Sequence, residues 1–169
     1  MELENIDYKI TAIDSVKRLL ESTFGDFFRA YFEGDPIDIP QSLLPCLVIE
    51  KLNGPVNQTA TGLDNNYSNI LIKVIFNKKD DFGAQGGDVD LTERKIRHII
   101  EGRDPETGGW LPNTIMYVIR HNITLDGTVV ENNSVDVSYD VDFRPGDNIT
   151  SEGYVTFTVR EHVIVNSRS

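Results

Sequence analysis

The segment 135–144 reads VDVSYDVDFR, and its alternation decides the fold class of this chain. Five apolar side chains occupy every second position: Val135, Val137, Tyr139, Val141 and Phe143. The positions between and after them are polar: Asp136, Ser138, Asp140, Asp142 and Arg144. Because successive side chains of a β-strand point to opposite faces, the apolar set is expected to face a core and the polar set to face solvent. The segment therefore predicts a strand whose outer face carries three carboxylates.

Two amphipathic helices are expected on the N-terminal side of this strand. In residues 10–31, apolar side chains recur every three or four positions, which is the spacing of one buried helix face. A second helix is expected to begin after Asp90, which stands three residues before Glu93 as in a capping box, and to stop at Gly102. Residues 114–123 fit both a helical face and a β-branched strand, and we favour a short helix there.

Three further strands complete the expected sheet. Residues 46–52, 70–76 and 154–165 are rich in β-branched or alternating apolar side chains. Residues 53–69 are rich in Gly, Asn, Thr and Ser, which predicts a long loop, and residues 145–153 are expected to connect the last two strands. The element order is α-β-β-α-(α)-β-β. It predicts an α+β fold with a mostly antiparallel four-stranded sheet and helices packed on one face.

Length and composition indicate one domain spanning residues 1–169. With 39% hydrophobic and 25% charged residues, the chain has the composition of a globular protein with a single core. Its formal net charge of −11 argues against tight nucleic-acid binding, because that binding depends on Lys and Arg at the phosphates. The apolar runs are shorter than the about 20 residues of a membrane helix, and the acidic N-terminus differs from a signal peptide. We therefore expect neither membrane insertion nor export.

The residue patterns do not indicate catalysis. The Gly-rich tract 83–87 follows a strand but lacks the Gly-Lys-Ser/Thr ending of a phosphate-binding loop, and the aspartates around it lack EF-hand spacing. The histidines, His98, His121 and His162, do not stand in a zinc-binding pattern. The single cysteine, Cys46, lies in an apolar run and is expected to be a buried thiol. We predict no enzyme activity, no catalytic, cofactor-binding or metal-binding residue, and no cofactor.

Two polar segments, residues 53–69 and 78–88, are predicted to be loops that make contacts on assembly, because they are too long for simple turns. Their candidate contact residues are Val56, Tyr67, Asp80, Asp81 and Phe82. Trp110 stands in a Gly-rich segment after the second expected helix, and we favour packing on the core over a role at an interface.

With this element order, the chain resembles the phage tail terminator, or tail completion, proteins. The resemblance is carried by the amphipathic helix at residues 13–28, by the strand PCLVIE at residues 45–50, and by residues 94–101 followed by Arg103-Asp104-Pro105 and residues 114–125. It spans most of the chain. It implies a structural protein that forms a ring, expected to be a hexamer, which caps the tail tube at its head-proximal end, stops tube polymerisation and joins the tail to the neck.

The resemblance also implies where such a protein acts and what it meets. It is expected in the tail and neck of the virion after assembly in the host cytoplasm, in contact with further copies of itself, the tail tube protein, a neck or head-completion protein and possibly the sheath. DNA would only pass through the lumen.

In such a ring, Asp136, Asp140 and Asp142 are candidates for lining the lumen, where they would repel phosphates, or for meeting a basic surface at an interface. An ordinary solvated face is the third interpretation. Two other functions stay open: a small soluble enzyme, either a hydrolase or a nucleotide-binding protein of unknown substrate, and another head-tail or neck adaptor.

Overall fold

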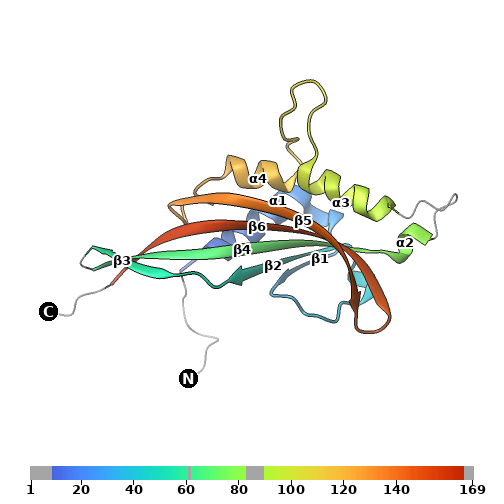
Figure 1. Ribbon diagram of the computed structural model, residues 1–169, viewed down its shortest axis with the longest axis horizontal. Coiled ribbons are helices and arrows are strands. Elements are labelled where there is room, and N and C mark those ends of the chain that lie inside the picture. Colours follow the sequence, from blue (N-terminus) through green and yellow to red (C-terminus); the bar gives the residue numbers. More distant parts are fainter. Residues whose placement is uncertain (1–8, 61, 83–89, 166–169) are drawn as a thin grey trace.

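The computed structural model describes residues 9–60, 62–82 and 90–165, which form one sheet with helices on one of its faces (Figure 1). The strands are β1 (Ala30–Glu33), β2 (Cys46–Leu52), β3 (Val56–Ala60), β4 (Leu63–Asn77), β5 (Glu131–Arg144) and β6 (Asn148–Ile164). The helices are α1 (Ala12–Phe24), α2 (Lys79–Phe82), α3 (Leu91–Glu101) and α4 (Ile115–His121), and short 3-10 turns occupy Gly25–Phe27 and Gln41–Leu43. The predicted α+β class is confirmed.

The sheet is mixed, with the strand order β1-β2-β4-β6-β5, and β3 pairs with β4 outside this path. Only the pairing of β1 with β2 is parallel, so the predicted mostly antiparallel character is also confirmed. The long strands β4 and β6 pair along their whole length, from Leu63 opposite Ile164 to Asn77 opposite Thr150. Their outer ends and β3 form a narrow arm that extends beyond the helices (Figure 1). The prediction of four strands is wrong, because β1 and β3 belong to the same sheet.

The main core lies between the sheet and the helices α1, α3 and α4. Alternate residues of the central strands point into it, as the period of two requires. The largest fully buried side chains of this core are Leu20, Leu47, Ile49, Ile70, Ile72, Ile96, Ile100, Ile115, Ile119 and Phe157. Each side chain of this size contributes about 1.5 to 3 kcal/mol when it is fully buried. Trp110 packs on the edge of this core, half-buried, as the sequence predicts.

Among the described residues, those that cover the opposite face of the sheet lie at one end of it. There, residues 34–45 run back across the strands, and Ile39 and Leu44 pack on Cys46, Val48 and Ile75. The rest of this face carries polar side chains, and we call it the open face. Cys46 is fully buried, and its burial raises the pKa of the thiol to about 12, as expected for an inert cysteine.

A buried aspartate joins the start of α3 to the sheet. The carboxylate of Asp81 accepts hydrogen bonds from the backbone nitrogen and the hydroxyl of Thr92, both at 2.8 Å, and forms an ion pair with Lys78 at 2.9 Å. The Thr92 hydroxyl also lies 2.7 Å from Ser151 Oγ of β6. The predicted capping box is therefore wrong: Asp90 occupies the N-cap position, but the side chain that caps the helix comes from Asp81.

The other differences from the predicted elements have local causes. The helix expected over residues 10–31 ends at Phe24, because Gly25 with φ 51 breaks it, and Tyr31 lies in β1. The loop expected over residues 53–69 is instead the hairpin of β3 and β4, and the connection expected over residues 145–153 is shorter because β6 begins at Asn148. The short helix favoured for residues 114–123 is confirmed as α4, whose N-cap Thr114 accepts a hydrogen bond from Tyr117.

Gly153 lets α3 pack directly on β6, and this gives a test of the packing. A Cβ atom at this position would lie 2.4 Å from Ile96 Cγ2 and 2.6 Å from Ile100 Cδ1. We expect Gly153→Ala to lower the free energy of unfolding by about 1 to 3 kcal/mol, the usual cost of overpacking a filled core. Urea unfolding followed by circular dichroism measures the change. Gly109→Ala is the matched control, because its Cβ would meet only Thr107 Oγ1 at 3.4 Å; an equal loss in both variants would contradict this account.

Candidate functional site

The open face presents side chains from four neighbouring strands, and β5 and β6 give it a regular polar surface. The register places Asp136 opposite Thr156, Ser138 opposite Tyr154, and Asp140 opposite Glu152. Val135, Val137 and Tyr139 point the other way and pack against the main core. The predicted alternation is thus confirmed for this part of β5.

At the end of β5 the alternation no longer separates buried from exposed residues. Val141 is 41% exposed and Phe143 is 77% exposed, while Arg144 is buried. The prediction that Val141 and Phe143 face the core and Arg144 faces solvent is therefore wrong. The hairpin of β5 and β6 curves away from the helix layer (Figure 1), which leaves these two apolar side chains exposed. Residues 34–39 instead lie against the other side of the hairpin and enclose Arg144.

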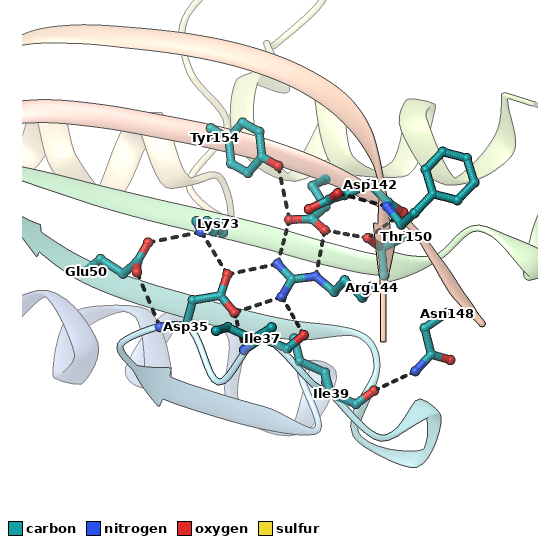
Figure 2. A network of polar contacts seen from close by, with 12 residues as sticks. Asp35, Ile37, Ile39, Glu50, Lys73, Asp142, Arg144, Asn148, Thr150 and Tyr154 are labelled. Carbon is teal, nitrogen blue, oxygen red and sulfur yellow. Dashed lines mark hydrogen bonds and ion pairs between the residues drawn. The ribbon is translucent and has the colours of Figure 1, made fainter. Parts of the chain in front are cut away.

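Arg144 is the centre of a buried ion-pair network (Figure 2). One edge of its guanidinium donates to both carboxylate oxygens of Asp35, at 2.7 and 2.9 Å. The other edge donates to both oxygens of Glu152, at 2.9 Å each. A further hydrogen bond of 3.1 Å reaches the carbonyl of Ile37. This double fork uses the planar geometry that distinguishes Arg from Lys.

Lys73 of β4 extends the network toward β2. Its ammonium lies 2.8 Å from Asp35 Oδ2 and 3.1 Å from Glu50 Oε2. Glu50 in turn accepts a hydrogen bond of 3.4 Å from the backbone nitrogen of Asp35. Three carboxylates and two cations thus alternate across the face (Figure 2).

Glu152 is buried at the base of the network, and hydroxyl groups complete its contacts. Tyr154 donates to it at 3.1 Å, and Thr150 also hydrogen-bonds to it. Burial and the neighbouring Glu152 carboxylate raise the pKa of Tyr154 above its usual value, so its hydroxyl remains a donor. A buried carboxylate costs little free energy only when it is paired and hydrogen-bonded, and this one has both kinds of partner.

The charges of the network stabilise one another. The hydrogen bonds from Arg144, and then those from Lys73, hold the pKa of Asp35 well below its usual range. Burial alone would lower the pKa of Arg144, but its two carboxylate partners raise it overall. Asp35 and Arg144 are therefore charged at neutral pH, and their contacts hold residues 34–39 and the β5–β6 hairpin against the sheet.

The three aspartates predicted as a site lie together on this face. Asp136, Asp140 and Asp142 are all exposed, and none forms an ion pair with a residue in the described part of the chain. Asp140 and Asp142 each accept a 2.8 Å hydrogen bond from the backbone nitrogen of the next residue. The face therefore carries a row of unpaired carboxylates beside the network.

The predicted contact residues do not come together. Val56 lies in β3 and is 60% exposed, and Tyr67 is half-buried in β4, so both belong to the arm. Asp80, Asp81 and Phe82 lie in α2 at the other end of the sheet (Figure 1). Asp80 and Phe82 are exposed, but Asp81 is buried beneath α3. The rest of the expected 78–88 loop, residues 83–88, lies outside the described residues.

One charged surface is not predicted from the sequence. Arg94, Lys95 and Arg97 are exposed on α3, on the side of the molecule away from the open face (Figure 1). Arg103 follows the helix and lies over the ring of Trp110, with 5.7 Å between Cζ and the ring centroid. The segment RKIRHIIEGR at residues 94–103 contains the signal, which is a concentration of basic residues in an acidic chain.

The histidines, the cysteine and the carboxylates of the described residues are dispersed with respect to metal binding. They contain no group of three or more His, Cys, Asp or Glu side chains that could hold a metal ion. His98 is exposed on α3, and the His121 ring stacks on Tyr117 in α4, whereas Cys46 is buried on the other side of the sheet. Among the described helices, none is long and apolar enough to cross a membrane.

Neither a scan against protein-family models nor a search of curated proteins finds a match to this chain.

The pH dependence of stability tests the network. Since the folded-state pKa of Asp35 is lowered, its contribution is complete above the unfolded-state pKa of about 3.9 and is lost as the pH falls toward the folded-state value. Asp35→Asn should cost about 3 kcal/mol at pH 7, because it removes one partner of a buried charge. It should also flatten the decline in stability below about pH 4. Urea unfolding at several pH values measures both effects.

Asp38→Asn is the control for this experiment, because Asp38 lies in the same segment and is exposed. We expect a change within about 0.5 kcal/mol at pH 7. Equal stability of the two variants at neutral pH would show that the Arg144 network does not hold residues 34–39 in place.

Proposed function

We propose that this protein is a phage tail terminator, which forms a ring, caps the tail tube at its head-proximal end and joins the tail to the neck. The observation that supports it best is the arm. Val56, Val163, Ile164 and Val165 are 60%, 41%, 75% and 47% exposed near the end of β3, β4 and β6. A narrow projection with uncovered apolar side chains is typical of a surface that is completed by a partner. Such a surface suits an assembly protein better than an isolated enzyme.

The position of the arm supports a contact between separate molecules. It projects from one end of the sheet, whereas α2 with the exposed Phe82 lies near the other end (Figure 1), where the exposed Phe27 lines a hollow together with Asp80 of α2. Surfaces at opposite ends of one subunit can meet only in different copies or in different proteins. In a ring this head-to-tail arrangement closes, and in an open assembly it continues as a helix.

The proposed partners are further copies of the chain, the tail tube protein and a neck or head-completion protein, with the sheath as a further contact in a contractile tail. The site of action would be the tail and neck of the virion. DNA would pass through the ring without being held, which agrees with the excess of 27 acidic over 16 basic residues. The proposal assigns no cofactor and no catalytic residue to the chain.

Mass and shape in solution test the ring. We expect size-exclusion chromatography with light scattering to give a species of about six chains, and negative-stain images to show rings with a central opening. Added to polymerising tube protein of the same phage, the purified protein should shorten the tubes and appear at one end. A monomer at every concentration, together with unchanged tube length, would refute the proposed function. Rings that bind the neck but leave tube length unchanged would instead indicate an adaptor.

The arm gives a second test of assembly. Val56→Asp combined with Ile164→Asp places two charges among the exposed apolar side chains and should leave the core intact, since both residues are exposed. We expect the variant to unfold at the same urea concentration as the wild type but to cap tubes at least about tenfold less well. Ile123→Asp, at an exposed apolar residue after α4, is the control. If the arm variant caps as well as this control, the arm is not a contact surface.

A further inference from the structure

Two surfaces of this protein carry opposite charge and lie on opposite sides of the sheet. The chain has 27 acidic and 16 basic residues, yet Arg94, Lys95 and Arg97 are clustered and exposed on α3. Val135, Val137 and Tyr139 of β5 point toward the helix layer, so Asp136 and Asp140 point to the other side of the sheet. The basic surface and the acidic row therefore face in opposite directions on one subunit.

The basic surface is hollowed. A hollow of about 500 Å³ lies between α3 and the segment that follows it. Its lining residues are Arg94, Arg97, His98, Glu101, Gly102, Arg103 and Trp110. Glu101 accepts a hydrogen bond from Tyr139, and Arg97 has one distant ion pair with Glu93 at 3.9 Å. Glu101, the acidic residue of this lining, is thus directed to a partner inside the subunit, whereas Arg94, Arg97 and Arg103 bring three cations to the hollow.

The wall of the hollow is preorganised. Arg103 Nε donates to the carbonyl of Gly108 at 2.7 Å, and its guanidinium lies over Trp110. Asp104 accepts hydrogen bonds from the backbone nitrogens of Glu106 and Thr107, at 2.8 and 2.9 Å, which fixes the projecting turn. A rigid wall loses little conformational entropy when a partner binds.

The acidic row is preorganised as well. It lies on β5, an edge strand whose end is fixed by the bonds of Arg144 to Asp35 and Glu152. The network pairs its own carboxylates, whereas Asp136, Asp140 and Asp142 form no ion pair with any described residue. Three carboxylates on one strand can approach a surface of several cations as a unit.

We propose that the basic hollow of one copy binds the acidic row of the next copy. This inference rests on the proposed ring and names one of its subunit contacts, and it assigns Asp136, Asp140 and Asp142 to an interface and not to the lumen. The partner is a second copy because the same chain offers both surfaces, with opposite charge and on opposite sides. Two such surfaces make a heterologous contact, which adds subunits in one direction until a ring closes.

The proposed contact would also offset the repulsion between copies that the net charge of the chain causes. Copies that each carry a net charge of −11 repel one another unless opposite charges meet at the interface. Exposed ion pairs are weakened by salt, since the Debye length falls from about 10 Å at 0.1 M to about 3 Å at 1 M. We therefore expect self-association of the wild type to weaken as the salt concentration rises.

Charge reversal tests the contact directly. One variant, called the acidic variant because it changes the acidic row, carries Asp136→Lys, Asp140→Lys and Asp142→Lys. The other, called the basic variant because it changes the basic hollow, carries Arg94→Glu and Arg97→Glu, which both line the hollow. Each variant alone brings like charges together at every contact, and we expect its self-association to fall by at least about 100-fold. An equal mixture pairs Lys with Glu at every second contact and Asp with Arg at the others. The mixture should form rings of alternating subunits, measured by light scattering and native mass spectrometry.

The outcomes separate this inference from the proposed function. Restoration in the mixture supports the contact and also shows that both variants are folded. If both variants form rings alone as the wild type does, the contact is refuted while the ring stands. If the variants dissociate and the mixture does not assemble, although circular dichroism shows both to be folded, the two surfaces are not each other's partners and the inference is wrong. A wild type that never self-associates refutes the ring and this contact together.

A separate measurement tests whether the hollow binds DNA and not a second copy of the chain. A DNA duplex with a fluorescent label reports on phosphate binding through its anisotropy. Under the proposed contact, the wild-type ring should bind this duplex no more tightly than a ring of the mixed variants. Tighter duplex binding that is lost in the basic variant, with rings intact, would overturn the proposal in favour of a nucleic-acid surface.

Discussion

The guanidinium of Arg144 is the group on which the arrangement of the open face depends. It lies at the end of β5 and binds Asp35 before β2 and Glu152 on β6, and Asp35 in turn binds Lys73 on β4. Three parts of the chain that are distant in sequence are thereby held at one point. Because a buried charge without a partner is far more costly than a paired one, these segments cannot separate independently. The second, smaller core beneath residues 34–45 is held closed by the same contact.

The network also determines which charges of the face remain available. Its carboxylates are engaged by Arg144, Lys73 and the hydroxyls of Tyr154 and Thr150. The aspartates of β5 are engaged only by neighbouring backbone nitrogens, where they are engaged at all. The carboxylates of this face therefore lie in two different environments in the fold. One is an internal clamp, and the other is an exposed row that is free to meet a cation.

The sequence predicts those parts of the fold that depend on local periodicity. The strand β2, the helix α3 and the alternation of β5 up to Tyr139 follow from it, because each has one face buried in the main core. It does not predict β3, which is polar and becomes a strand only by pairing with β4. Arg144 is the clearest failure. The alternation of β5 places Arg144 on the same face as the exposed aspartates. Its partner Asp35 is 109 positions away, so no local sequence pattern connects Arg144 to Asp35. The acidic row is found from the sequence, whereas the basic hollow is missed because it combines α3 with Trp110 beyond a turn.

Packing all the main helices on one side of the sheet places a constraint on the other side. An uncovered sheet face must be polar, or it must be covered by something else. In this chain the two solutions are combined: residues 34–45 cover one end of that face, and a polar network follows. The arm extends beyond both and carries exposed apolar side chains. The polar part is stable alone, because its buried charges are paired within the subunit. In the proposed ring, the arm would gain from a partner, since its exposed apolar side chains would lose contact with water there. A chain built in this way would fold before assembly and bury its arm on joining the ring.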